Sequence, residues 1–168
     1  MNNAVQADFE LLDQQLRALT GNETDQLANS ANFVAMLYGA LPDINWLGIY
    51  VLRGSELVLG PFQGKPACVR IPLGQGVCGQ AAQQLQTLRV GDVHAFDGHI
   101  ACDIASESEI VVPLLRDGRL IGVLDIDSPT KERFSELDQV GIEKLCRTFE
   151  QFAAPESGSS GSSHSRFI

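Results

Sequence analysis

Two long apolar stretches, each divided by a short polar turn, constrain the fold most. The first, "NWLGIYVLRGSELVLGPF", turns around Gly54 between expected strands at 46–52 and 56–61. The second, "SEIVVPLLRDGRLIGVLDIDS", turns at Asp117 and Gly118. Asp-Gly is a preferred pair in tight hairpin turns, because it tolerates the backbone twist that matches the flanking strands. The sequence therefore predicts two β-hairpins and, with them, an antiparallel sheet.

Helical patterns flank these hairpins. A second helix should follow a cap at Asn22 or Thr24, and a final helix is expected over 134–154, with Ser135 as its cap and Asp138 three residues on. "GVCGQAAQQLQ" predicts a short helix between the hairpins, and "TLRVGD" predicts a short strand. The first helix is indicated by apolar residues at helical spacing, at Val5, Phe9, Leu12, Leu16 and Leu19. We expect an α+β fold in which terminal helices flank a sheet of five or six strands.

Length and composition favour one domain. The chain has 168 residues, of which 44% are hydrophobic, which is enough to bury a core. We assign residues 1–154 to a single domain. Residues 155–168 have the sequence "PESGSSGSSHSRFI". This segment is rich in glycine and serine and is expected to form a flexible tail.

The overall charge limits the classes of partner. The net charge of −9 at pH 7 disfavours binding to nucleic-acid phosphates or to an anionic membrane. The first residues lack the basic and apolar regions of a secretory signal, and no apolar run reaches the roughly 20 residues of a membrane span. We therefore expect a cytoplasmic protein, whose cysteines are free, catalytic or metal-bound rather than joined in structural disulfides.

Three cysteines fall in or beside irregular segments rich in glycine and proline, namely Cys68, Cys78 and Cys102. Thiols in exposed loops react once they are deprotonated. Two such cysteines that meet in space can act as a pair. The first is the nucleophile, which takes up an oxygen atom and becomes a sulfenic acid, and the second is the resolving cysteine, which condenses with it to form a disulfide. Idle surface thiols are the alternative. Cys146, in the last helix, is expected to pack in the core, and the lack of a C-x-x-C pair argues against zinc.

Acidic residues mark the second hairpin. Glu109 begins one strand, and Asp125 and Asp127 end its partner on one face. Either they are solvated, or they bind a cation, or one of them holds a proton that it can donate.

Aromatic and basic groups offer further candidates. Trp46 and Tyr50 share one face of the first strand. Either they pack in the core, or they form an aromatic wall that contacts a methyl or thioether group of a ligand. His94 and His99 lie in the loop 92–107 with Cys102. Either they are solvated, or they favour the thiolate form of Cys102 if they lie close to it.

The motifs "NWLGIY", "LGPFQGKPACVRIPLGQGVCG", "DVHAFDGHIACDIASESEIVVPL" and "LIGVLDIDSP" together closely resemble those of the free methionine-(R)-sulfoxide reductases, which are built on a single GAF domain. The resemblance covers about residues 30–150, with the elements in order. It implies a six-stranded antiparallel sheet flanked by N- and C-terminal helices. By the same resemblance Cys102 is the nucleophile, Cys68 the main resolving cysteine and Cys78 an auxiliary one. The substrate-binding residues are expected to be Trp46, Tyr50, Glu109, Asp125 and Asp127.

The resemblance implies reduction of free methionine-(R)-sulfoxide to methionine. Cys102 would attack the sulfoxide sulfur and become a sulfenic acid, and Cys68 would then close a disulfide that thioredoxin reduces. No metal or organic cofactor is required. The terminal helices are compatible with a homodimer and equally with core packing in a monomer.

Two other hypotheses are compatible with the same residues. In the first, the chain is a non-catalytic GAF module that binds a ligand or senses redox state. In the second, it is a thiol protein that scavenges peroxide. The chain leaves no length for an output domain, and ligand binding alone does not need three loop cysteines, so we favour the reductase.

Overall fold

The structure, a computed structural model, describes residues 7–96, 98 and 105–152. One sheet has the strand order β3-β2-β1-β6-β5-β4, and its neighbouring strands are antiparallel. Its strands are β1 (Trp46–Arg53), β2 (Glu56–Gln63), β3 (Arg70–Pro72), β4 (Leu88–Val90), β5 (Ser108–Arg116) and β6 (Arg119–Ser128). The helices are α1 (Phe9–Thr20), α2 (Gln26–Ala40), α3 (Gly76–Gln84) and α4 (Glu136–Phe152), with a short 3₁₀ helix η1 (Val93–Ala95).

Both predicted hairpins are confirmed, as is the α+β fold. Asp117 and Gly118 have φ angles of 50° and 72°, and positive φ at both central residues is what the favoured two-residue hairpin turn requires. A short strand that the sequence did not predict, β3, pairs with β2 and extends the sheet.

The helix caps agree with the sequence in one case and differ in the other. Ser135 Oγ accepts from the Asp138 amide at 3.1 Å, and an Asp138 carboxylate oxygen accepts from the Ser135 amide at 2.9 Å. The expected cap of α2 at Asn22 or Thr24 is wrong. Asp25 takes that place, because its carboxylate accepts from the Ala28 amide at 2.8 Å.

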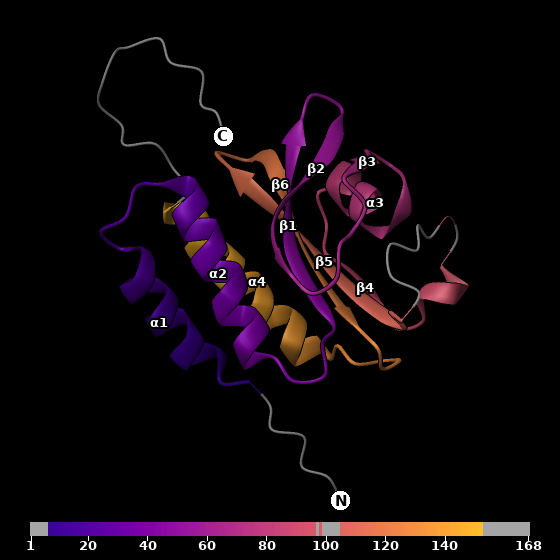
Figure 1. Ribbon diagram of the computed structural model, residues 1–168, viewed down its shortest axis with the longest axis horizontal. Helices are drawn as coiled ribbons and strands as arrows, with labels where there is room; N and C mark the ends of the chain where they lie inside the picture. The colour runs from indigo at the N-terminus through magenta and orange to yellow at the C-terminus, as the bar shows by residue number, and fades with distance from the viewer. Residues whose placement is uncertain (1–6, 97, 99–104, 153–168) are drawn as a thin grey trace, which may run out of the picture.

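Helices cover the two faces of the sheet unequally. Figure 1 shows α1, α2 and α4 together on one side and α3 on the other. The first side is an apolar core, here called the helix-side core, whose buried members include Leu16, Phe33, Ile110, Leu124, Cys146 and Phe149. The second, here called the α3-side cluster, includes Trp46, Tyr50, Cys78, Val111 and Val123.

The described helices give no sign of a bilayer-spanning segment, since none of them is both long enough and apolar enough. The predicted tail at 155–168 lies outside the described residues.

Candidate active site

Strand register gathers the predicted acidic and aromatic residues on the α3 side of the sheet. Trp46 on β1 pairs with Asp127 on β6, and Asp127 pairs with Glu109 on β5, so these three residues form a row across neighbouring strands. Asp125 lies two residues from Asp127 and therefore on the same face. It is opposite Gly48 on one neighbouring strand. The sequence placed the two aspartates on one face, and the register adds Glu109 and Trp46 to them.

Helix α3 adds a thiol to this acidic row. Cys78 Sγ lies 3.9 Å from Glu109 Oε1, and the ligand atoms of Cys78, Glu109 and Asp125 all lie within 4.8 Å of one another. Cys78 is 4% exposed, whereas the sequence placed it in an exposed segment. That expectation is wrong because α3 packs against the sheet and buries its first turn.

The buried acids hold protons more tightly than ordinary carboxylates. Burial raises the pKa of Glu109 well above its usual range, and the charges of Asp125 and Asp127 raise it further. Burial raises the pKa of Asp125 to about 6. Two acids that share a dry site do not both ionise readily, so the site retains a proton to a higher pH than an isolated carboxyl group would and can donate it to a bound oxygen.

Cys78 is a poor thiolate. Burial, with the nearby charges of Asp125 and Glu109, raises the pKa of its thiol well above the usual range. A thiol must ionise to act as a nucleophile. The structure therefore presents Cys78 as a protonated hydrogen-bond donor to Glu109, rather than as an activated sulfur.

The predicted aromatic pair supports the chain segment that carries Cys68. Trp46 Nε1 donates to the Lys65 carbonyl at 3.0 Å, and the Tyr50 hydroxyl donates to the Cys68 carbonyl at 3.0 Å. The Trp46 ring stacks on Tyr50, and it lies over Gly48, where a Cβ would collide with the indole. Alternation places both aromatics on this face, but these long-range hydrogen bonds have no signal in the sequence.

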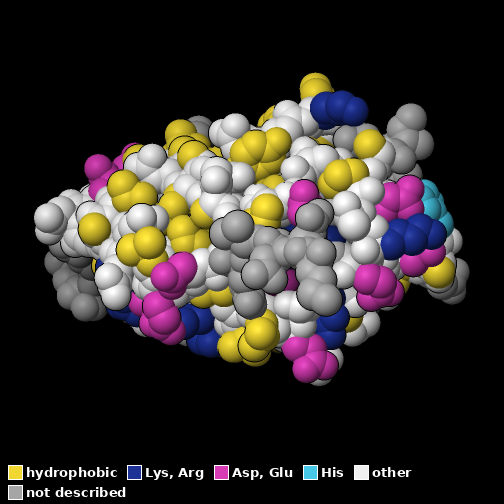
Figure 2. All heavy atoms as spheres, turned by 90° about the horizontal axis from the view of Figure 1, so that it is seen from below, with side chains coloured by type: hydrophobic (Ala, Val, Ile, Leu, Met, Phe, Trp, Pro, Cys, Tyr) yellow, Lys and Arg dark blue, Asp and Glu magenta, His cyan; other side chains and the backbone are white. Residues whose placement is uncertain are grey.

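The remaining predicted candidates fall into different places. Cys68 is disulfide-bonded, whereas Cys78 and Cys146 are free thiols. Cys102 and His99 lie outside the described residues. His94 is in a surface network, with Nε2 3.5 Å from a Glu107 carboxylate oxygen. Figure 2 shows a histidine among acidic and basic side chains at one edge of the molecule.

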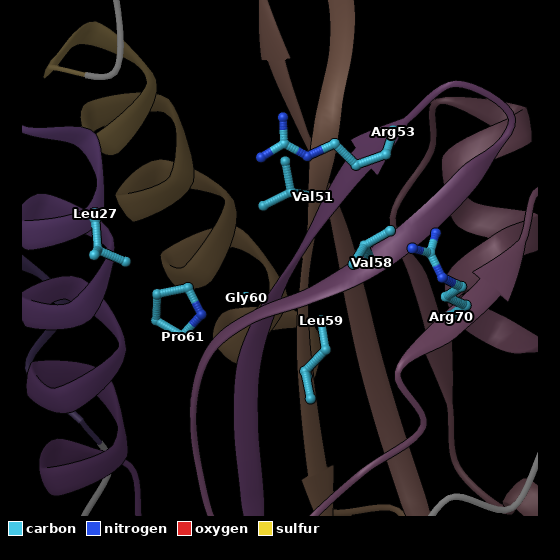
Figure 3. Close-up of a pocket in the computed structure, with 8 residues that line it drawn as sticks. All are labelled: Leu27, Val51, Arg53, Val58, Leu59, Gly60, Pro61 and Arg70. Carbon is cyan, nitrogen blue, oxygen red and sulfur yellow. The ribbon is translucent and has the colours of Figure 1, made fainter. Parts of the chain in front are cut away.

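A hollow lies apart from this chemistry and is lined by residues of α2 and of strands β1, β2 and β3. It has a volume of about 460 Å³, and Figure 3 shows Leu27 and Pro61 facing one another across it. Arg53 and Arg70 are its charged lining residues, and the lining includes neither a cysteine nor a carboxylate among the described residues. The predicted reaction needs both groups, so this hollow is not the candidate site.

Comparison with known proteins agrees with the fold and points to one activity. A model described as "GAF domain" matches residues 16–154. The chain is 54% identical over 149 residues to protein YtsP of Bacillus subtilis, covering 88% of this chain and 91% of that protein. It is 54% identical over 143 residues to the free methionine-R-sulfoxide reductase of Escherichia coli, covering 85% and 87%.

Solved structures give the same result. The fRMsr of Staphylococcus aureus, in complex with its substrate, has a TM-score of 0.85 and 46% identity to this chain. The match covers 89% of this chain and 97% of that one. Both the sequence and the three-dimensional arrangement are therefore similar over nearly the full length of these proteins.

Proposed function

Because the chain belongs to the GAF domain family and, within it, to the free methionine-R-sulfoxide reductases, we propose that it reduces free methionine-(R)-sulfoxide to methionine by thiol chemistry. The observation that carries the proposal is the row of Trp46, Asp127 and Glu109 across three strands, with Asp125 beside it. This row offers an apolar surface for a methyl group and carboxylates for a cation within one site.

The acidic row explains why the substrate would be the free amino acid. The ammonium of free methionine sulfoxide can pair with Asp127 and its neighbours, and the methyl end can lie against the Trp46 ring. A methionine sulfoxide inside a polypeptide has no ammonium, so it would forgo this charge pairing with the acidic row and bind less tightly. A sulfoxide-containing peptide should therefore be a poor substrate.

Glu109 is the acid in this proposal. The Cys102 thiolate attacks the sulfoxide sulfur while the oxygen takes up a proton, and methionine leaves as Cys102 becomes a sulfenic acid. Burial raises the pKa of Glu109, so its carboxyl group holds a proton to a higher pH than an ordinary carboxyl group does, and the oxygen needs a protonated acid. The Cys68 thiol then displaces water from the sulfenic acid and forms a disulfide.

Cys68 is favoured over Cys78 as the resolving cysteine. Its carbonyl is held by the Tyr50 hydroxyl at the edge of the site, and the residue is disulfide-bonded. Cys78 is buried and its thiol pKa is raised, so it is slow to ionise. A dithiol protein such as thioredoxin would complete the cycle in the cytoplasm by reducing the disulfide.

The first test is to incubate the reduced protein with each diastereomer of free methionine sulfoxide and a dithiol, and to measure the methionine released. Turnover of the R form alone is expected, and Cys102→Ser should abolish it. Residual turnover in that variant would refute Cys102 as the nucleophile. If neither form is turned over while the thiols are confirmed to be reduced, the chain is a non-catalytic GAF module.

A second test separates the two candidate resolvers. Cys68→Ser should release one methionine per chain and then stall when thioredoxin is the only reductant, because the sulfenic acid has no partner thiol. Cys78→Ser should keep multiple turnover and is the matched control. The opposite pattern would make Cys78 the resolver.

A further inference from the structure

The α3 side of the sheet holds three groups that are known metal ligands in one buried place. Cys78 comes from α3, Glu109 from β5 and Asp125 from β6, and their ligand atoms lie within 4.8 Å of one another. All three residues are between 4% and 6% exposed. Three separate elements hold them, so the arrangement belongs to the packed fold and not to one flexible segment.

The spacing suits a zinc-like ion. Zn²⁺ lies about 2.3 Å from a thiolate and about 2.1 Å from a carboxylate oxygen, which places the two ligand atoms about 3.5 Å apart at a tetrahedral angle. The observed separation between Cys78 Sγ and Glu109 Oε1 is 3.9 Å. A few tenths of an ångström of side-chain movement would bring these two atoms to bonding positions, and the Asp125 ligand atom lies within 4.8 Å of both.

A second observation points to a ligand at this place. Asp125 is 6% exposed, and its Oδ1 accepts no hydrogen bond within the part of the chain that the structure describes. A buried carboxylate oxygen without a donor costs free energy, and most such oxygens in folded proteins have a partner. A cation among the three ligands would supply one.

We propose that Cys78, Glu109 and Asp125 form a binding site for a thiophilic divalent ion of the zinc group. The ion would displace the Cys78 thiol proton to solvent, and the resulting thiolate favours Zn²⁺ and Cd²⁺ over Mg²⁺ and Ca²⁺, which prefer oxygen ligands. Three protein ligands leave a fourth position open. Since Glu109 and Asp125 also belong to the proposed substrate site, a bound ion would compete with methionine sulfoxide. That consequence rests on the proposed function, but the metal site itself does not.

The test uses the oxidised full chain, in which Cys68 is disulfide-bonded and cannot supply a competing thiol. Cd²⁺ alone is titrated into the protein, and the thiolate-to-cadmium charge-transfer absorption in the ultraviolet is recorded. We expect saturable binding of a single ion with this band. No turnover is measured, so the result stands independently of whether the protein reduces methionine sulfoxide.

Two cysteine variants identify the ligand. Cys78→Ser should lose the band, whereas Cys146→Ser should keep it, because Cys146 is buried in the helix-side core. Glu109→Gln and Asp125→Asn should each keep a thiolate band but weaken binding by at least about tenfold, since even outer partners of metal ligands contribute that much. Circular dichroism checks that each variant is folded. A missing band in the parent protein, or a band that persists in Cys78→Ser, would overturn the proposal.

Discussion

Cys78 and Cys146 are both free thiols and are nearly equally buried, at 4% and 2% exposed, yet they lie in different chemical surroundings. Cys146 packs in the helix-side core among leucine, isoleucine and phenylalanine side chains. Cys78 lies in the α3-side cluster, against Glu109 and Asp125. Burial raises the pKa of both thiols. Burial alone therefore does not distinguish a packing cysteine from one in a polar site, whereas the neighbouring side chains do.

The sheet itself makes the difference between the two sides. Along β5, Glu109 belongs to the acidic row, while the next residue, Ile110, belongs to the helix-side core. The same alternation on β6 separates Asp125 from Leu124 and Ile126. One strand thus supplies stability from one face and chemistry from the other, and changes to adjacent residues should have separable effects.

Glu109→Gln tests the chemical face and should have the largest effect on activity among changes to these two faces of the sheet. Glutamine keeps the shape of the side chain but has no acidic proton, so methionine release should fall about 10²- to 10⁴-fold if Glu109 protonates the sulfoxide oxygen. The thermal midpoint of unfolding should not fall, because burial already disfavours the charged carboxylate. Methionine release at the parent rate would remove Glu109 from the role of acid.

Ile110→Ala tests the opposite face at the next residue. Ile110 is fully buried, and truncation of such a side chain to alanine costs about 2–5 kcal/mol in the free energy of unfolding, because it leaves a cavity. Urea unfolding measures this loss. Turnover per folded molecule should stay close to that of the parent. A variant that keeps its stability and loses activity would contradict the division between the two faces.

The pH dependence of stability offers a third comparison. Burial raises the pKa of Asp125 from 3.8 to about 6, so between these values the folded state keeps a proton that the unfolded state releases. The contribution of this group to stability is full below about pH 4 and is lost as the pH rises through about 6. Asp125→Asn should flatten the curve of unfolding free energy against pH in this window. An unchanged slope would show that Asp125 ionises normally.

Tyr50→Phe should destabilise the protein less than Ile110→Ala does. It removes the hydroxyl that donates to the Cys68 carbonyl, at a cost of about 0.5–1.5 kcal/mol. Release of the first methionine should keep its rate, while disulfide formation should slow, because the Cys68 segment is held less firmly. Rapid quenching with thiol counting separates the two steps. Tyr38→Phe, on the helix side, is the matched control, and equal slowing in both variants would refute a specific role for Tyr50.

Much of the fold could be predicted because its signals are local. The two hairpins have turn residues and strand periodicity that act over a few residues, and the Ser135 cap needs only the first turn of α4. β3 has three residues and no such signal. It forms because β2 offers an edge with which its backbone can pair.

In the candidate site too, the features with local signals could be predicted, and those that depend on long-range packing could not. Residue types, alternation and motif resemblance predict Glu109, Asp125, Asp127 and Trp46 as residues of the candidate site. The burial of Cys78, its contact with Glu109 and the anchoring of the Cys68 segment by Tyr50 depend on how α3 and β2 pack against the sheet. The order of residues along each strand dictates which groups can reach the candidate site. Packing between elements far apart in the chain dictates which of those groups are dry and in contact, because desolvation and long-range hydrogen bonds arise from that packing.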